Sequence, residues 1–294
     1  MDRIEQDVRW GTPASVRLRK PARPRAWGEL AKHAFMILVC LLLLYPFALM
    51  LQMSVKDTEQ IMYEFFRISS PYHFDNYARA WSEVGPMIKN SVVMAGGSAL
   101  ISIFITAAAG YGFGKLKFPG KEPLYWIVFA KMMLPGVMNL IPSFVLAWKL
   151  GLLNSYWAVI LFAVGGAQPF WVFVMRTFVA GQPQELFDSA KVDGAGEARI
   201  FWHIALPLLR PVLSLSALNV FLGVWNDYIW PLVTIQSFDK RPITTGLAYL
   251  SSTHVGDYGP LMAGYVIASV PLFLLFAFGM KQFVQGLTGG AVKL

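Results

Sequence analysis

Six long apolar segments constrain the fold of this chain more than any other feature of its sequence. They cover approximately residues 34–54, 89–113, 123–147, 157–178, 212–233 and 260–280. A helix needs roughly 20 apolar residues to cross the ~30 Å hydrocarbon core of a bilayer, so each segment is long enough to span a membrane once. Lipid offers no water to satisfy open backbone groups, which favours helices. The sequence therefore predicts an all-α, polytopic membrane helix bundle with about six transmembrane helices.

The composition agrees with a membrane protein and offers no catalytic or metal site. Only 14% of the residues are charged, whereas soluble domains carry roughly 25%. The single cysteine, Cys40, lies inside the first apolar segment, so no disulfide within the chain is possible. The four histidines are scattered without metal-ligand spacing, at His33, His73, His203 and His254. We therefore predict no catalytic residue and no metal.

The basic residues orient the segments. Eight of the 25 Lys and Arg residues lie in the tail 1–33, ahead of the first segment. With this tail in the cytoplasm, seventeen basic residues fall on the cytoplasmic side and seven on the opposite side, as the positive-inside rule requires. A cleaved signal peptide is disfavoured, because the first apolar run is too long and no small-x-small site follows it. Both termini are therefore expected in the cytoplasm.

The connections between the segments differ in length. Two external loops, 55–88 and 234–259, are long enough to contact a partner outside the membrane. The cytoplasmic loop 179–211 is amphipathic and predicts two short helices, 184–192 and 197–205, with Gly194 between them and Pro207 after the second. A helical hairpin on this face has no role in spanning the bilayer, so we expect it to dock onto another protein.

The hairpin carries a spaced motif. An acidic residue, a serine and an alanine stand in a row, and a glycine follows after three further residues. The sequence Ile-x-Leu-Pro follows after nine more. The motif residues are Asp188, Ser189, Ala190, Gly194, Ile204, Leu206 and Pro207. This resembles the EAA loop of binding-protein-dependent ABC permeases. Aspartate replaces the glutamate of that pattern and keeps its charge, with an arm one methylene shorter. Serine replaces an alanine and keeps the small size.

The resemblance runs from about Asn90 to the C-terminus and is closest to the smaller permease subunit of maltose and carbohydrate uptake systems. Three further stretches support it: Trp-Asn-Asp-Tyr-Ile-Trp-Pro at 225–231, Phe-Val-Gln-Gly-Leu-Thr at 283–288 and Gly-Gly-Ala-Val-Lys at 289–293. It implies the type I ABC importer permease fold. The expected organisation is a basic cytoplasmic tail (1–33), a first transmembrane helix (34–54), a periplasmic loop (55–88), a permease core (89–281) and a cytoplasmic tail (282–294).

The resemblance also implies a function and a set of partners. The chain would form half of the alternating-access pore of an ATP-driven oligosaccharide importer in the bacterial inner membrane. It would pair with a second permease subunit in a heterodimer, two ATPase subunits and a periplasmic or extracellular solute-binding protein, but not with nucleic acid. The first hairpin helix would enter a cleft of the ATPase, with Asp188 near a basic residue and Gly194 permitting a turn that a side chain would obstruct.

The chain has no ATP site of its own. A P-loop needs Gly, four residues, then Gly-Lys-Ser/Thr, so that backbone amides cradle phosphate. Gly114-Lys115 is followed by leucine, and Gly120-Lys121 by glutamate. We therefore expect no cofactor on this chain, with ATP and Mg in the partner ATPase.

A candidate substrate path comprises Trp225, Asn226, Asp227 and Tyr228 in the fifth segment and Lys131 in the third. Polar residues inside a membrane usually face the protein interior or a water-filled path. Two interpretations stay open for the first four, contact with a sugar or hydrogen bonding between helices. Lys131 either lines the cavity or extends to the interface. The tail from Gln285 either reaches the ATPase or ends free.

Two alternatives to carbohydrate import remain. The chain could be an ABC permease for peptides, phosphate or polyamines. A proton-coupled secondary transporter would need carboxylates buried in several segments, and Asp227 is the only candidate. The sequence does not identify the sugar, although the basic balance and Lys131 suggest an acidic, uronate-type oligosaccharide.

Overall fold

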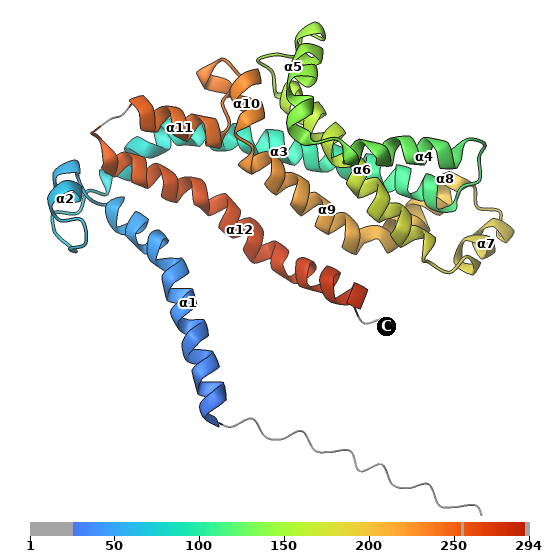
Figure 1. The fold of residues 1–294 in the computed structure, drawn as a ribbon, viewed down its shortest axis with the longest axis horizontal. Helices are drawn as coiled ribbons and strands as arrows, with labels where there is room; N and C mark the ends of the chain where they lie inside the picture. The colour runs from blue at the N-terminus through green and yellow to red at the C-terminus, as the bar shows by residue number, and fades with distance from the viewer. Residues whose placement is uncertain (1–25, 254–255, 292–294) are drawn as a thin grey trace, which may run out of the picture. The chain divides into compact units, whose positions relative to one another are not determined.

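The computed structural model describes residues 26–253 and 256–291, and every regular element in these ranges is a helix (Figure 1). Side chains are described as far as residue 277. Most of the predicted tail 1–33 and the last residues of the tail 282–294 lie outside the described part. The chain divides into two units, residues 1–47 and 48–294. The first contributes most of α1 (Ala26–Met53), which is long enough to span a membrane.

Five helices are long and apolar enough to cross a membrane, and a sixth span is possible if one bent pair of helices counts as one. One of the five is α1, and the other four are α3 (Asp75–Lys115), α6 (Tyr156–Ala180), the stretch Glu197–Asn226 that includes α9 (Leu206–Asn226), and the part of α12 (Tyr258–Ala291) up to Ala277. The prediction of an all-α bundle with about six spans is confirmed. The helix bounds differ, because α3 begins at Asp75 rather than at residue 89 and α12 continues to Ala291.

The third predicted span is not a straight helix. It consists of α4 (Lys121–Ala130) and α5 (Leu140–Lys149), joined through the 3-10 turns Lys131–Met133 and Gly136–Asn139, and its two halves are bent by 103°. Leu134 precedes a proline and takes an extended backbone conformation, with ψ of 123°. A residue before proline is pushed out of the helical region, and proline lacks a backbone N–H. The helix therefore ends at this point.

The fifth predicted span, 212–233, is also broken. The helix α9 ends at Asn226, Asp227 is extended, and the short α10 (Ile229–Thr234) follows. Pro231 has no N–H with which to continue helical bonding to the Asp227 carbonyl. That carbonyl accepts a hydrogen bond from Thr244 Oγ1 instead, at 2.7 Å.

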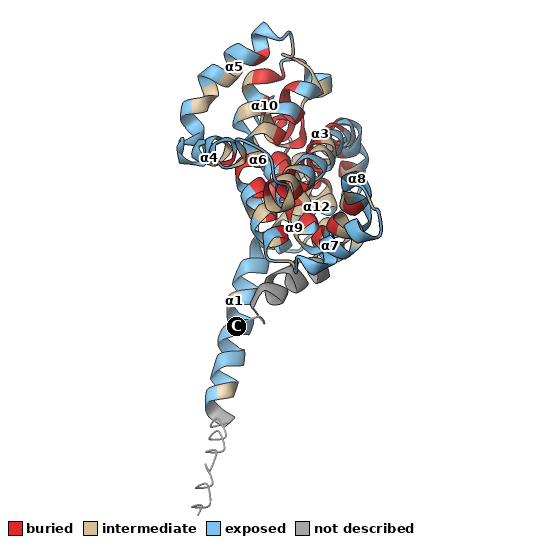
Figure 2. Ribbon diagram, turned by 90° about the vertical axis from the view of Figure 1, so that its right-hand side faces the viewer, coloured by how far each residue is buried: buried red, intermediate tan, exposed pale blue. Residues whose placement is uncertain are grey.

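Within the unit 48–294, α3 packs along α6, α9 and α12 and forms the centre of the bundle. Figure 2 shows that the buried residues gather where these helices meet. Small residues let α3 and α6 approach closely: a Cβ on Gly110 would lie 2.3 Å from Met175 Cβ. Small residues at membrane helix interfaces allow this kind of backbone approach.

The predicted hairpin contains α7 (Glu185–Val192) and α8 (Glu197–Ile200). The expectation that the second helix ends before Pro207 is wrong. α8 continues through a π-helical turn (Phe201–Ala205) into α9, and Leu206 N–H donates to the Phe201 carbonyl. Pro207 then falls in the first turn of α9, where a missing N–H costs little.

The other end of the bundle carries the short helix α2 (Thr58–Tyr63), the 3-10 turn Phe238–Lys240 and α11 (Ile243–Thr253). Asn90 of α3 joins this region to the bundle. Its Nδ2 donates to the carbonyls of Asp239 (2.8 Å) and Arg241 (2.9 Å), and its Oδ1 accepts from Tyr156 Oη.

Candidate coupling hairpin and membrane cavity

The hairpin helix α7 is anchored on the end of α3 by one aromatic residue. Phe187 is 1% exposed, and its ring centroid lies 6.3 Å from that of Tyr111. Lys115 Nζ lies 4.6 Å from the same centroid, within the range of a cation–π interaction. The hairpin is therefore packed against α3 and does not hang free from its two connections.

A glutamate joins three elements at this point. Glu197 of α8 accepts a hydrogen bond from Tyr111 Oη of α3 at 2.5 Å and pairs with Lys191 Nζ of α7 at 2.7 Å. The hydrogen bond from Lys191 to Glu197 raises the pKa of the lysine ammonium. The contacts hold α7, α8 and the end of α3 in one arrangement.

The entry to the hairpin is also bonded to α3. Lys115 Nζ donates to the Gln182 carbonyl (2.8 Å) and to Gln184 Oε1 (3.1 Å). Gln184 Nε2 in turn donates to Asp188 Oδ1 (3.0 Å). Asp188 therefore belongs to a short polar chain that begins on α3, while its side chain stays exposed.

The turn after α7 is a Schellman motif centred on Gly194. The Ala195 N–H donates to the Ala190 carbonyl (2.9 Å) and the Gly194 N–H to the Lys191 carbonyl (3.0 Å). Gly194 has a φ of 78°, in the left-handed region that favours glycine. A Cβ there would meet no atom within 4 Å. The expectation that a side chain would obstruct the turn is therefore corrected: the backbone conformation, not space, requires glycine.

The structure divides the predicted coupling residues into two groups. Asp188 and Ser189 are exposed on α7, Ala190 is half-buried beneath them, and Gly194 makes the turn. The second group, which lies at the start of α9 and packs into the bundle, consists of Ile204, Leu206 and Pro207. Two apolar side chains of α7, Leu186 and Val192, are also exposed, the latter to 87%.

Sequence reasoning missed the residues that hold the hairpin in place. Tyr111, Lys115 and Glu197 stand outside the motif, and their pairing depends on how α3 packs against the hairpin. A lysine and a glutamate six positions apart carry no pairing signal by themselves, because they sit on different helices across a turn.

A cavity of about 720 Å³ lies between the bent pair α4 and α5, the helix α6 and α10. Its lining is mostly apolar, with Lys131, Asn139, Ser143 and Asp227 among its polar residues. This size is within the usual range for small-ligand sites. Lys131 is among the residues that line the cavity.

The lysine ammonium has a local partner. Lys131 Nζ donates to the Gly165 carbonyl at 2.6 Å. Within α6 that carbonyl would normally accept from the residue four positions later, but this residue is Pro169, which has no N–H. The lysine therefore satisfies a carbonyl that the proline leaves open.

The four predicted residues of the fifth segment do not act as one group. Asp227 lines the cavity, and its Oδ1 accepts from the Trp230 N–H at 3.3 Å. Trp225 is buried in the bundle and stacks on Phe221. Asn226 donates to the Leu222 carbonyl of its own helix. Tyr228 is exposed and, like Trp225 and Asn226, is not among the cavity-lining residues.

Residues 106–289 match the family described as binding-protein-dependent transport system inner membrane component. The chain is 30% identical over 265 residues to the diacetylchitobiose uptake system permease protein NgcG of Streptomyces coelicolor, covering 89% of this chain and 88% of that protein.

Two solved structures have the same fold. A bacterial ABC transporter that imports the acidic polysaccharide alginate matches with a TM-score of 0.77 at 19% identity, covering 89% of this chain and 99% of that chain. A bacterial alginate ABC transporter in complex with an alginate pentasaccharide-bound periplasmic protein matches with a TM-score of 0.62 at 18% identity, covering 86% and 92% of the two chains.

Proposed function

The chain belongs to the family of binding-protein-dependent transport system inner membrane components, and from this membership we propose that it is the permease subunit of an ATP-driven carbohydrate importer. It forms half of an alternating-access pore. The observation that carries the proposal is the hairpin: the first three residues of a motif of the expected spacing lie on α7, an exposed helix that packs on α3 through Phe187 and is joined to α8 by Lys191 and Glu197. Import of a sugar is supported by the diacetylchitobiose uptake permease at 30% identity.

The hairpin is the contact with the ATPase. Leu186, Ser189 and Val192 lie three residues apart on α7 and are all exposed, so they present one face to a cleft. Asp188 adds a negative charge beside them. ATP and Mg belong to the partner ATPase, and this chain binds no cofactor. ATP binding would shift the population of the pore only if it favours one conformation over the other.

The complete importer contains a second permease subunit in a heterodimer, two ATPase subunits and a solute-binding protein. The family description names binding-protein dependence, and one structure of the same fold includes a periplasmic protein with bound pentasaccharide. The distribution of basic residues supports the bacterial inner membrane with both termini in the cytoplasm. The cavity beside Lys131 and Asp227 is the candidate sugar path.

Co-purification with the ATPase tests the role of the hairpin. Val192→Asp places a charge on the exposed face of α7, and the fold is expected to tolerate it because Val192 is 87% exposed. Lys117→Asp is the matched control, since it alters an exposed residue of the neighbouring turn between α3 and α4. We expect the wild type and Lys117→Asp to retain the ATPase and Val192→Asp to lose it. Equal retention in all three would show that the hairpin is not the contact.

A further inference from the structure

The segment between α1 and α3 buries a lysine. Lys56 is 1% exposed. Its Nζ donates to the carbonyls of Glu64 and Arg67, both at 2.6 Å. Gln52 Nε2 donates to the Arg67 carbonyl as well, at 2.8 Å. Side chains of Lys56 and of Gln52, at the end of α1, therefore satisfy two carbonyls of this non-helical stretch.

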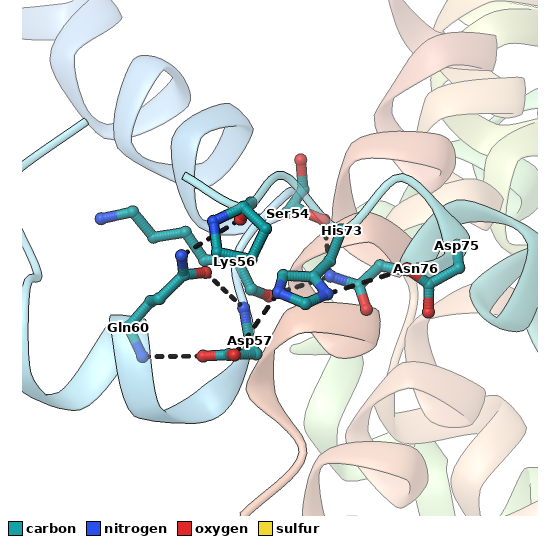
Figure 3. Close-up of polar contacts among 8 residues, drawn as sticks. Ser54, Lys56, Asp57, Gln60, His73, Asp75 and Asn76 are labelled. Carbon is teal, nitrogen blue, oxygen red and sulfur yellow. Dashed lines mark hydrogen bonds and ion pairs between the residues drawn. The ribbon is translucent and has the colours of Figure 1, made fainter. Parts of the chain in front are cut away.

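Further hydrogen bonds close the segment onto the bundle (Figure 3). Asp57 caps α2 through a reciprocal capping box with Gln60. Asn76, in the first turns of α3, donates from Nδ2 to the carbonyls of Ser54 (3.1 Å) and Lys56 (2.9 Å). The His73 N–H donates to the Val55 carbonyl at 2.8 Å. These bonds fix both ends of the segment and give it one defined conformation.

The outer surface of the same segment exposes many apolar side chains, together with the charged residues Glu59, Arg67 and Asp75. Its most exposed large apolar side chains, which we name the aromatic rim, are Met62, Tyr63, Phe66, Ile68 and Phe74. Tyr63 is 83% exposed and Phe66 71%. Single exposed apolar residues are ordinary, but a cluster on a rigid frame indicates contact with a membrane or a protein.

Two membrane spans end at this segment. The apolar run of α1 ends at Met53, directly before it, and the apolar part of α12 begins at Tyr258. The start of α12 touches the segment: a Cβ on Gly259 would lie 2.2 Å from the Lys56 carbonyl oxygen. Thr58 Oγ1 donates to the Gly256 carbonyl at 2.5 Å. The segment therefore lies at the level where both helices leave the hydrocarbon core.

We propose that the aromatic rim is a lipid anchor that inserts between the headgroups and acyl chains at the outer boundary of the membrane. Tyrosine and other aromatic rings favour this boundary. Irregular backbone is tolerated near lipid only where its polar groups are already bonded, and Lys56 and Gln52 supply those bonds. The anchor would fix the height of the outer ends of α3 and α12 in the bilayer while the pore changes conformation.

Spin-label accessibility tests the anchor directly. In the assembled importer in lipid nanodiscs, with Cys40 replaced by serine, single labels are placed through Tyr63→Cys, Phe66→Cys and Ile68→Cys. Asp239→Cys is the matched control, an exposed charged residue of the other external loop. We expect the three rim labels to collide more with oxygen than with a water-soluble nickel reagent, and the control to show the reverse.

Two results would overturn the anchor. If the rim labels collide with the nickel reagent as often as the control label does, the rim lies in water. Labels that become protected only when the liganded solute-binding protein is added would assign the rim to that protein. Three separate positions keep the test informative if one variant fails to assemble. The anchor depends on the chain spanning a membrane and not on which solute it carries, so its failure leaves sugar import untouched.

Discussion

At the residue scale, two prolines explain two hydrogen bonds that side chains make to main-chain carbonyls. Pro169 leaves the Gly165 carbonyl without a helical donor, and Lys131 supplies one. Pro231 has the same relation to the Asp227 carbonyl, which Thr244 satisfies. A carbonyl left without a donor away from water costs about 1–3 kcal/mol. Both polar residues therefore have a structural role whatever they do for the substrate.

This role leads to a prediction for Lys131. Lys131→Met removes the donor to Gly165, so we expect uptake of an acidic and of a neutral oligosaccharide to fall by a similar factor. The measurement is uptake of both sugars into proteoliposomes that contain the complete importer. If Lys131 instead recognises acidic substrates, the variant will lose only the acidic sugar, and Lys131→Arg will restore it.

At the element scale, the length and end of α7 depend on one glycine. Gly194→Val places a β-branched residue in the left-handed region, which is unfavourable by about 1–2 kcal/mol relative to glycine. We expect the end of α7 to shift and ATPase binding to weaken. Gly194→Asn should weaken it less, because asparagine tolerates this conformation.

The neighbouring glycine provides the control for this prediction. Gly196 has a φ of −70° and open space around its Cα, so Gly196→Ala should leave ATPase binding unchanged. Binding is measured by titrating the ATPase against the purified permease pair in detergent. Equal losses from Gly194→Asn and Gly196→Ala would show that flexibility of the whole turn matters, rather than the left-handed residue.

At the scale of the whole molecule, α3 joins the two ends of the bundle. Its 41 residues extend on the order of 60 Å at ~1.5 Å per residue. Tyr111 and Lys115 bind the hairpin near one end, and Asn90 and Asn76 bind the segments 234–259 and 55–74 toward the other. α3 therefore offers one direct connection, beside α6 and α9, through which a displacement of the hairpin could reach those segments.

Tyr111 offers a test of this transmission. Tyr111→Phe removes the hydroxyl that donates to Glu197 and keeps the ring that packs on Phe187, at a cost of about 0.5–1.5 kcal/mol. We expect ATP hydrolysis to continue while fewer sugar molecules are transported per ATP. The ratio of uptake to hydrolysis in proteoliposomes measures this, with Tyr125→Phe, another buried tyrosine, as control. A ratio unchanged from wild type would exclude this contact from coupling.

The sequence by itself determined the helical class, the number of apolar segments and the place of the hairpin. Hydropathy, proline placement and motif spacing act over one or two turns, so they are readable along the chain. Even the break at Pro135 has a local cause, although its 103° angle depends on how α5 packs against α10.

Only the tertiary structure decided which side chains share a site. Glu197 meets Tyr111 across 86 positions, and Asn90 meets Asp239 across 149. Trp225 and Asp227 are two residues apart, yet one is buried in the bundle and the other lines the cavity, because the helix ends between them. Lys56 lies in the predicted loop 55–88 and is only 1% exposed. Whether a side chain is buried, and which residues it contacts, depends on the packed surfaces around it. Those surfaces form from segments that are distant in the chain.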